Sequence, residues 1–210
     1  MLSLIFYGTN MSNKIFSGYR LVLASGSPRR RELLAGLGAD MVIADKFECD
    51  ESYPASLGGE EVAGYLSRKK AEAYSGTLKE SDILITADTV VLVDGKVLGK
   101  PVDRYNAINM LSVLSGKRHS VITGVTAVIK GQQHTFSETS YVKFKKLEDW
   151  EIVYYVDNFK PYDKAGSYAV QEWIGYIGIE HIEGSYYNIV GLPVQRLYAF
   201  LSDRLGFDGL

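Results

Sequence analysis

The sequence predicts an α/β fold in which helices flank one long, twisted, mixed β-sheet, and three patterns lead to this prediction. An apolar run over 82–87, bounded by acidic residues, is typical of a strand buried on both faces. Residues 121–129 and 135–144 alternate apolar and polar side chains as long strands do, and a turn at Lys130-Gly131 would join them as an antiparallel pair. Between the first of these strands and the antiparallel pair, apolar residues over 103–115 recur at helical spacing.

The N-terminal part of the chain is expected to form a strand followed by two helices. The strand begins near Arg20 and stops at Ser25. A helix begins at Pro28, because proline fits the first helical turn, where an N–H would be unpaired in any case. A second helix is expected over 59–74.

A hairpin and a third helix are expected in the middle of the chain. The strand at 82–87 is expected to end at Asp88. Asp94-Gly95 accepts the positive φ angles of a two-residue turn, so a small hairpin would follow directly. Asp103 can cap a helix that Gly116 would end.

The C-terminal third is expected to combine helices with short strands. Helical spacing returns over 147–156, further short strands are expected over 166–189, and a last helix follows Pro193 through Leu201. The sequence contains no internal repeat and no low-complexity linker. We therefore expect a single domain over 20–204, preceded by an N-terminal extension of residues 1–19 whose order the pattern leaves open.

The composition indicates a globular protein without a strong overall charge. Among 210 residues, 23 are basic and 25 acidic, so no global field attracts nucleic acid polymers or membranes. A single cysteine excludes an internal disulfide, and the histidines lack metal-ligand spacing. Apolar runs fall short of the roughly 18 residues typical of a membrane span. A cytoplasmic protein is expected, and any anion site must be local.

The clearest local signal lies where the first strand meets the first helix. Ser25 and Ser27 supply hydroxyl groups, and Arg29 and Arg30 supply planar guanidinium donors. The positive end of the helix dipole lies beside them, so the group is complementary to phosphate oxygens. An ordinary capped helix with a solvated basic turn is the alternative interpretation.

Asp88 is the first candidate for catalysis, because the predicted strand places it at a carboxyl end, where open α/β sheets usually bind ligands. A strand terminator is the simpler interpretation. The hairpin would bring Lys100 towards this edge, although a loop lysine is usually just solvated. Lys70 and Glu51 become candidates only if the fold brings them together. A further polar cluster lies around the glycine in 161–171.

Taken together, these strings resemble the Maf-type nucleotide pyrophosphatases. The matching strings follow the family's order and span about Leu21 to Leu201. They are Leu23-Ala24-Ser25-Gly26-Ser27-Pro28-Arg29-Arg30, Ala87-Asp88-Thr89-Val90-Val91, Gly99-Lys100-Pro101, Leu114-Ser115-Gly116, Thr123-Gly124-Val125, Asp163-Lys164-Ala165-Gly166, Gly184-Ser185-Tyr186-Tyr187 and Val190-Gly191-Leu192-Pro193.

The resemblance implies a Maf/ITPase-like fold with two lobes around a central cleft. It also implies hydrolysis of nucleoside triphosphates between the α and β phosphates, with a divalent cation (Mg²⁺ or Mn²⁺), by a homodimer. Asp88 would be the proton acceptor, Glu51 and Asp88 the metal carboxylates, and Lys70 and Lys100 catalytic cations. The implied substrate-binding residues are Ser25, Ser27, Arg29, Arg30, Thr89, Asp163, Lys164 and Gln171.

Within that family, the string 163–171 resembles the branch that acts on dTTP and UTP. Arg29, Thr89 and Gln171 occupy positions linked there to substrate choice. A glutamine amide suits a pyrimidine edge, but it could equally pair with a purine. Two alternatives stay open: a hydrolase of 7-methyl-GTP or of damaged nucleotides in general, and a nucleotide-binding regulator of cell division, which needs no catalytic carboxylate.

Overall fold

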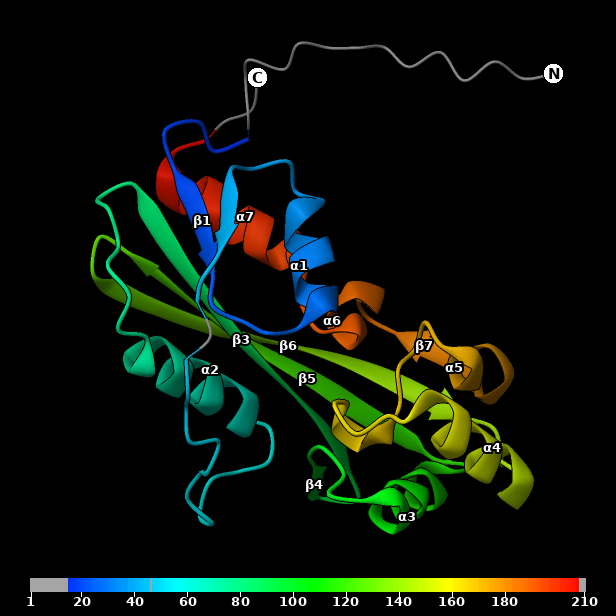
Figure 1. The fold of residues 1–210 in the computed structure, drawn as a ribbon. Helices are drawn as coiled ribbons and strands as arrows, with labels where there is room; N and C mark the ends of the chain where they lie inside the picture. The colour runs from blue at the N-terminus through cyan, green and yellow to red at the C-terminus, as the bar shows by residue number, and fades with distance from the viewer. Residues whose placement is uncertain (1–14, 46, 208–210) are drawn as a thin grey trace, which may run out of the picture.

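A long, mixed sheet runs diagonally through the computed structural model, which describes residues 15–45 and 47–207 (Figure 1). Its strands are β1 (Arg20–Leu23), β2 (Met41–Ile43), β3 (Asp82–Val93), β4 (Lys96–Leu98), β5 (Arg118–Ile129), β6 (Gln132–Phe144) and β7 (Ile179–Glu183). The helices are α1 (Pro28–Ala35), α2 (Val62–Ala73), α3 (Arg104–Leu114), α4 (Asp149–Phe159), the 3₁₀ turn η1 (Ala165–Ser167), α5 (Trp173–Gly178), α6 (Tyr186–Val190) and α7 (Val194–Leu205).

Parallel and antiparallel pairing meet at β3. The strand order is β2-β1-β3-β5-β6-β7, and β4 also pairs with β3. β1 is parallel to both β2 and β3, whereas β3, β5, β6 and β7 pair antiparallel along the rest of the sheet. The predicted mixed sheet flanked by helices is therefore confirmed.

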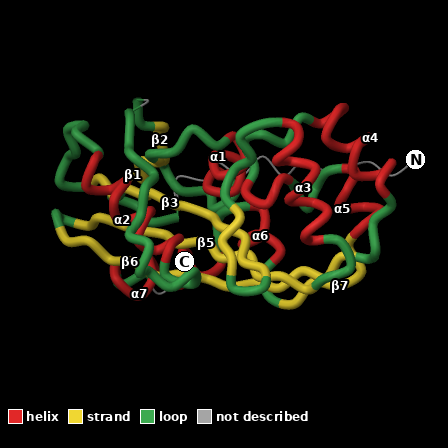
Figure 2. Tube along the Cα trace, turned by 90° about the horizontal axis from the view of Figure 1, so that it is seen from below, coloured by secondary structure: helices red, strands yellow, loops and turns green. Residues whose placement is uncertain are grey.

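The helices cover the two faces of the sheet unequally. Val90 and Ile122 pack under α2 on one face. Neighbouring residues of the same strands point to the opposite face. There, Ala87 and Val125 pack with α1 and α7, and farther along the strands Val91 packs with α3 and α4. Figures 1 and 2 show these two helix groups towards opposite ends of the long strands.

Several local predictions are confirmed in detail. Asp94 and Gly95 have φ angles of 48° and 74°, as the predicted hairpin turn requires. The Asp103 carboxylate accepts a hydrogen bond from the Asn106 N–H at 2.7 Å and so caps α3. At the start of α1, the Ser27 hydroxyl accepts from the Arg30 N–H at 3.4 Å.

The predicted end of the strand at Asp88 is wrong. β3 continues to Val93, because β5 pairs with it in continuous register from Ile83 to Leu92. The local pattern did not reveal this length, since the paired residues of β5 lie 28 to 46 positions farther along the chain. β2, a three-residue strand, was also not predicted.

The prediction of several short strands over 166–189 is also wrong. Among the described residues, that segment contains one strand, β7, and otherwise η1, α5 and α6. Gly166 and Ser167 have φ angles of 66° and 63°, in the left-handed region, which ends any extended run there. The Ser185 hydroxyl accepts from the Asn188 N–H and starts α6 instead.

Most of the expected N-terminal extension lies outside the described residues. From residue 15 the chain contacts the fold: Ile15 bridges to Ala39, and the Phe16 side chain is buried against Tyr198 and Phe207.

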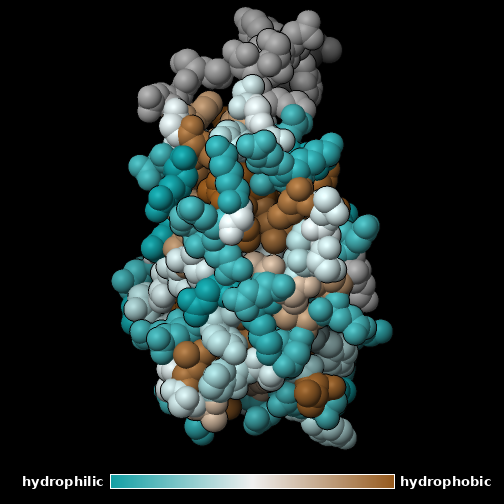
Figure 3. Space-filling view, turned by 90° about the vertical axis from the view of Figure 1, so that its left-hand side faces the viewer, coloured by the Kyte–Doolittle hydropathy of each residue, from teal (hydrophilic) through white to brown (hydrophobic). Residues whose placement is uncertain are grey.

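Figure 3 shows apolar residues gathered in the upper part of one side of the molecule, with hydrophilic residues around them. The longest described helices, α2 and α7, have 12 residues each, and none of the described helices is long and apolar enough to cross a membrane.

Candidate active site

The candidate site lies at a stretch of β3 that is open along one edge. β1 pairs with β3 as far as Ile85, and β4 pairs with it only from Val91. In the register of the described strands, residues 86–90 therefore have a strand neighbour only on the β5 side. Asp88 lies at the centre of this opening. It is the end of the pairing with β1, and not the end of β3, that leaves Asp88 at an open edge, where its side chain is 11% exposed.

A cavity of about 420 Å³ opens at this edge and is lined by residues of α1, α2, α6 and the loop that contains η1. Ligand pockets in proteins typically measure roughly 300–1,000 Å³, so a nucleotide-sized molecule fits. The structure brings every candidate residue of the sequence analysis to this cavity: Ser25, Ser27, Arg29, Arg30, Glu51, Lys70, Asp88, Thr89, Lys100, Asp163, Lys164 and Gln171.

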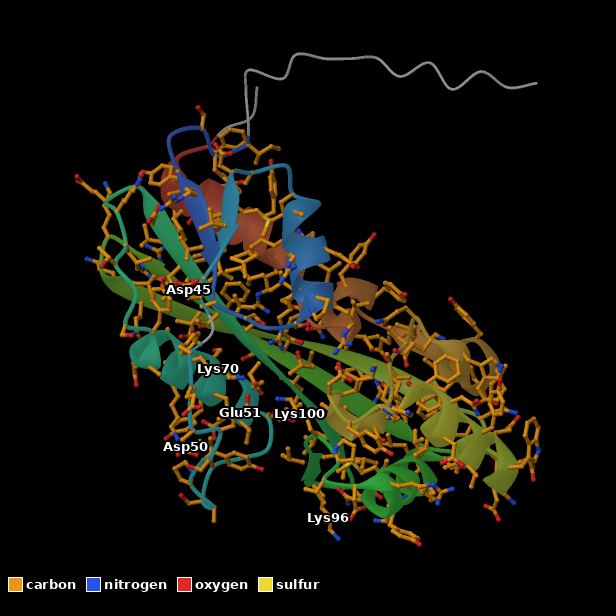
Figure 4. The ribbon with its side chains drawn as sticks, in the orientation of Figure 1. Asp45, Asp50, Glu51, Lys70, Lys96 and Lys100 are labelled. Carbon is orange, nitrogen blue, oxygen red and sulfur yellow. The ribbon has the colours of Figure 1, made fainter. Side chains whose placement is uncertain are left out.

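Four charged side chains form an alternating chain across the open edge. Asp88 Oδ1 lies 2.5 Å from Lys70 Nζ, and Lys70 Nζ lies 2.9 Å from Glu51 Oε1. Glu51 Oε2 lies 3.1 Å from Lys100 Nζ. Figure 4 shows Glu51, Lys70 and Lys100 close to one another beside the middle of the sheet. Glu51, Lys70 and Lys100, which are unremarkable individually, thus converge on Asp88, the first candidate of the sequence analysis.

Close packing of α2 against the sheet explains how Lys70 reaches Asp88. Gly124 of β5 pairs with Asp88 in the sheet register. A Cβ atom at Gly124 would lie 2.3 Å from the carbonyl carbon and oxygen of Ala63, so only glycine allows this approach. The Thr86 hydroxyl donates to the Ser67 carbonyl at 2.7 Å and ties α2 to β3. Lys70 follows Ser67 by one helical turn.

The lysines keep the Glu51 carboxylate ionised. Burial raises the pKa of Glu51, but the hydrogen bonds and charges of Lys70 and Lys100 outweigh that effect and lower the pKa to about 2. The side chains of Glu51 and Lys100 remain 45% and 53% exposed, so they can exchange partners when an anion enters.

Arg30 lies at the open edge with most of its donors engaged by the protein. Its Nη1 donates to the Ala87 carbonyl at 2.8 Å, its Nη2 to the Thr89 hydroxyl at 3.0 Å, and its Nε to the Gly191 carbonyl at 2.9 Å. A longer contact joins Nη1 to the Ser25 hydroxyl at 3.3 Å. Arg30 thus fixes α1 and the end of α6 to β3.

Arg29 connects α1 to the loop on the other side of the cavity. Its Nη1 lies 3.3 Å from Asp163 Oδ2, and Asp163 Oδ1 lies 2.7 Å from Lys164 Nζ. Burial raises the pKa of Asp163, but Lys164 and Arg29 outweigh it and lower that pKa below its usual range. The Arg29–Asp163 pair is long and partly exposed, so it contributes little to stability.

The loop 163–172 forms the less charged end of the cavity. Gln171 Oε1 is buried without a hydrogen-bond partner, and the buried Tyr168 and Ala169 line the same end. An unpaired buried acceptor is costly, so a ligand donor at this position would be favourable. Trp173, which follows this loop, packs against the rings of Trp150 and Tyr154.

Sequence reasoning missed the residues that support this loop. Tyr155 donates a hydrogen bond to Glu172 Oε2, and Glu172 Oε1 lies 3.3 Å from Lys164 Nζ. Tyr168 shares a hydrogen bond with His119 Nε2 at 2.7 Å. Tyr155 carries no local signal, because in the sequence it looks like an ordinary core aromatic. Tyr168 lies within the polar cluster 161–171, but nothing in the sequence singles out its hydroxyl.

The carboxylates at the open edge fit a magnesium-type ion. Among the described residues, no group of three or more His, Cys, Asp or Glu side chains forms a complete metal site. Glu51 and Asp88 nevertheless flank one atom, Lys70 Nζ, so their oxygens lie close together. Mg²⁺ is commonly held by one or two carboxylates, with phosphate oxygens of the substrate completing its shell. The donor set fits an ion that arrives with a nucleotide.

The chain is similar to known proteins over most of its length. A family model described as "Maf-like protein" matches residues 20–204. The chain is 54% identical over 183 residues to the dTTP/UTP pyrophosphatase of Bacteroides thetaiotaomicron, covering 87% of this chain and 95% of that protein. It is 46% identical over 195 residues to the dTTP/UTP pyrophosphatase of Christiangramia forsetii, covering 93% and 99%. Among solved structures, a HAM1 protein from Coxiella burnetii aligns with a TM-score of 0.45 and 14% identity, covering 88% of this chain and 99% of that chain.

Proposed function

The chain belongs to the Maf family, and from that premise we propose that it hydrolyses dTTP and UTP to the monophosphate and pyrophosphate. The convergence of Asp88, Lys70, Glu51 and Lys100 at the open edge of β3 supports this proposal most strongly. The names of the similar proteins favour it over the 7-methyl-GTP and regulatory alternatives. A pure nucleotide sensor would need no carboxylate beside the lysines.

The charged end of the cavity suits the triphosphate. We call it the phosphate wall: Ser25, Ser27, Arg29, Glu51, Lys70, Asp88 and Lys100. Among the described residues, Arg29 and Lys100 form ion pairs with exposed carboxylates, and a triphosphate would compete for them. The hydroxyls of Ser25 and Ser27 and the N-terminal end of α1 add donors at the same place.

Asp88 is proposed as the general base towards water. Hydrolysis of the α–β bond requires a water molecule in line with the departing pyrophosphate and neutralisation of the phosphate oxygens. Lys70 holds the Asp88 carboxylate in a fixed orientation at 2.5 Å. Glu51 and Asp88 would hold the divalent cation. When bound, this cation would supply charge neutralisation at the phosphates and lower the pKa of a coordinated water.

The loop 163–172, which we call the base wall, is proposed to receive the nucleobase. Gln171 can present its unpaired Oε1 to an imino N–H of a pyrimidine and its amide N–H to a carbonyl. Asp163, at the start of this loop, lies 3.3 Å from Arg29 of the phosphate wall, and Thr89 also lines the cavity; the ribose and the first phosphate would lie near them.

Three further expectations stay predictions: a homodimer, a cytoplasmic location and no affinity for nucleic acid polymers. The balanced charge of −2 supports the last of them.

Pyrophosphate release from dTTP, UTP, 7-methyl-GTP and ATP, each with Mg²⁺ or Mn²⁺, tests the proposal. We expect selective release from dTTP and UTP. Equal or purine-favouring rates would refute the pyrimidine preference, and nucleotide binding without any release would favour the regulatory alternative.

A further inference from the structure

We propose that Tyr155 is a positioning residue for nucleoside recognition, because its hydroxyl holds the backbone turn that carries Gln171 into the cavity. The inference rests on the proposed function and adds a residue behind the cavity to those that set substrate choice. Tyr155 lies on α4, in the hydrophobic core that supports the base wall, and its side chain is 0% exposed.

The Tyr155 hydroxyl contacts both ends of one turn. It donates to Glu172 Oε2 and accepts the Ala169 N–H at 3.2 Å. The Glu172 N–H in turn donates to the Ala169 carbonyl at 3.1 Å. A single hydroxyl therefore closes residues 169–172 into a fixed shape, and Gln171 lies inside that turn.

The hydroxyl itself is held rigidly. The Tyr155 ring stacks on Phe159 with 5.0 Å between the ring centroids, and close packing leaves it one orientation. Burial raises the pKa of Tyr155, and the Glu172 carboxylate raises it further, so the hydroxyl stays protonated and keeps donating at neutral pH.

Glu172 also contacts the other end of the base wall. Its second oxygen lies 3.3 Å from Lys164 Nζ, and Lys164 is itself buried and paired with Asp163 at 2.7 Å. The same carboxylate thus links the Tyr155 hydroxyl to both ends of the loop. If the hydroxyl is removed, Glu172 loses a donor and the Ala169 N–H loses its acceptor, which frees the turn to shift.

Removing the Tyr155 hydroxyl should therefore weaken the binding of ligands that carry a base and leave the binding of other ligands unchanged. Asp88, Lys70, Glu51 and Lys100 are held by α2, by β3 and by one another. Inorganic tripolyphosphate carries no base, so it would occupy the phosphate wall without reaching Gln171. It therefore separates a change in base recognition from a general loss of structure.

The test compares Tyr155→Phe with the wild-type protein in dTTP and ATP hydrolysis and in inhibition by inorganic tripolyphosphate. We expect the KM for dTTP to rise by about tenfold, with a small change in kcat. The dTTP-to-ATP ratio of kcat/KM should fall by a similar factor. The inhibition constant of tripolyphosphate should stay within about twofold of the wild-type value.

Tyr154→Phe is the matched control. Tyr154 is the preceding residue of α4, it is 44% exposed, and its ring packs against Trp173 at 4.8 Å between centroids. The variant loses the same hydroxyl group from a site that does not hold the turn, so it should retain wild-type kinetics and selectivity.

Wild-type KM and selectivity in a folded Tyr155→Phe would overturn the inference, as would a parallel loss of tripolyphosphate inhibition. If Tyr155→Phe does not fold, Glu172→Gln provides the test, because it keeps the side-chain size and weakens the contacts of residue 172 with Tyr155 and Lys164. For this variant too, the KM for dTTP should rise while the inhibition constant of tripolyphosphate stays near the wild-type value. Failure of the proposed function would look different, since the wild-type protein itself would then release no pyrophosphate from dTTP.

Discussion

The two walls of the cavity are built by opposite means. The phosphate wall consists mainly of charged side chains from separate segments. Glu51 and Lys100 remain 45% and 53% exposed, whereas Lys70 and Asp88 are 12% and 11% exposed. The base wall is one short loop whose members are mostly buried: Tyr168 is 6% exposed, Ala169 7% and Lys164 8%.

This difference indicates how a triphosphate and a base are recognised. Charge attraction falls off slowly with distance, so an exposed cation such as Lys100 can attract phosphate oxygens from more than one position. Hydrogen bonds to a base require donors and acceptors placed within a few tenths of an ångström. The base wall accordingly has a backbone fixed from behind, by Tyr155 and by the His119–Tyr168 pair.

Removal of the central cation should have the largest effect on the phosphate wall. Lys70→Gln leaves Asp88 and Glu51 as adjacent carboxylates without the ammonium that joins them. We expect kcat for dTTP to fall by roughly a thousandfold, the scale typical for loss of a phosphate-stabilising group. Pyrophosphate-release kinetics measure this.

Lys69→Gln is the control for that variant. Lys69 neighbours Lys70 but pairs with the exposed Asp50 at 2.7 Å. Near-wild-type turnover is expected from it, and equal losses in the two variants would show that general positive charge, and not the Lys70 position, matters.

Displacing α2 should have the next largest effect. In Gly124→Ala, the new methyl group meets the Ala63 carbonyl, so α2 must move and carry Lys70 away from Asp88. A shift of about 1 Å at reacting groups can cost roughly a hundredfold in rate, and overpacking costs about 1–3 kcal/mol of stability. Thermal unfolding together with dTTP kinetics measures both. Unchanged turnover would mean that the contact between α2 and β5 does not position Lys70.

Protonation of His119, which lies behind the base wall, should have the smallest effect. It should lower the stability of the fold and leave the rate of hydrolysis unchanged. Burial lowers the pKa of His119 to about 4, from 6.5 in the unfolded chain. Since the unfolded state binds the proton more tightly between these values, stability should fall as the pH drops below 6.5. Linkage gives roughly 2 kcal/mol lost between pH 7 and about pH 5.

Denaturant unfolding of His119→Gln at several pH values tests this linkage. The glutamine stays neutral, so the pH dependence should become shallower by that amount. The exposed His181 offers the matched control: His181→Gln should keep the wild-type dependence, and a His119→Gln protein that also keeps it would contradict the assignment.

Local chemistry explains which parts of the fold could be predicted from sequence. Pro28, Asp94-Gly95 and Asp103 each specify a turn or cap through their own backbone or side chain, and the structure has those features. The length of β3 depends on pairing with a distant strand, and it was underestimated for that reason. Gly166 and Ser167 adopt left-handed angles that only the surrounding packing determines.

The candidate site likewise combines residues with a local sequence signal and residues whose role depends on tertiary contacts. Charged and hydroxyl residues could be proposed individually and through family resemblance, and the fold brings them to one cavity. Tyr155 could not be found that way, because its ring belongs to the apolar stripe of α4 and its function lies in one buried hydroxyl. The engagement of Arg30 with the Ala87 and Gly191 carbonyls likewise depends on tertiary structure.

The most direct test of the account is a comparison of dTTP turnover and dTTP binding in Asp88→Asn. The substitution removes a proton acceptor and keeps the shape of the side chain, so turnover should fall by roughly a thousandfold while the Kd for dTTP changes by less than about fivefold. Asp94→Asn, in the hairpin turn where Asp94 pairs with Lys117, should behave as wild type. An Asp88→Asn protein that still released pyrophosphate at the wild-type rate would contradict the assignment of catalysis to the open edge of β3.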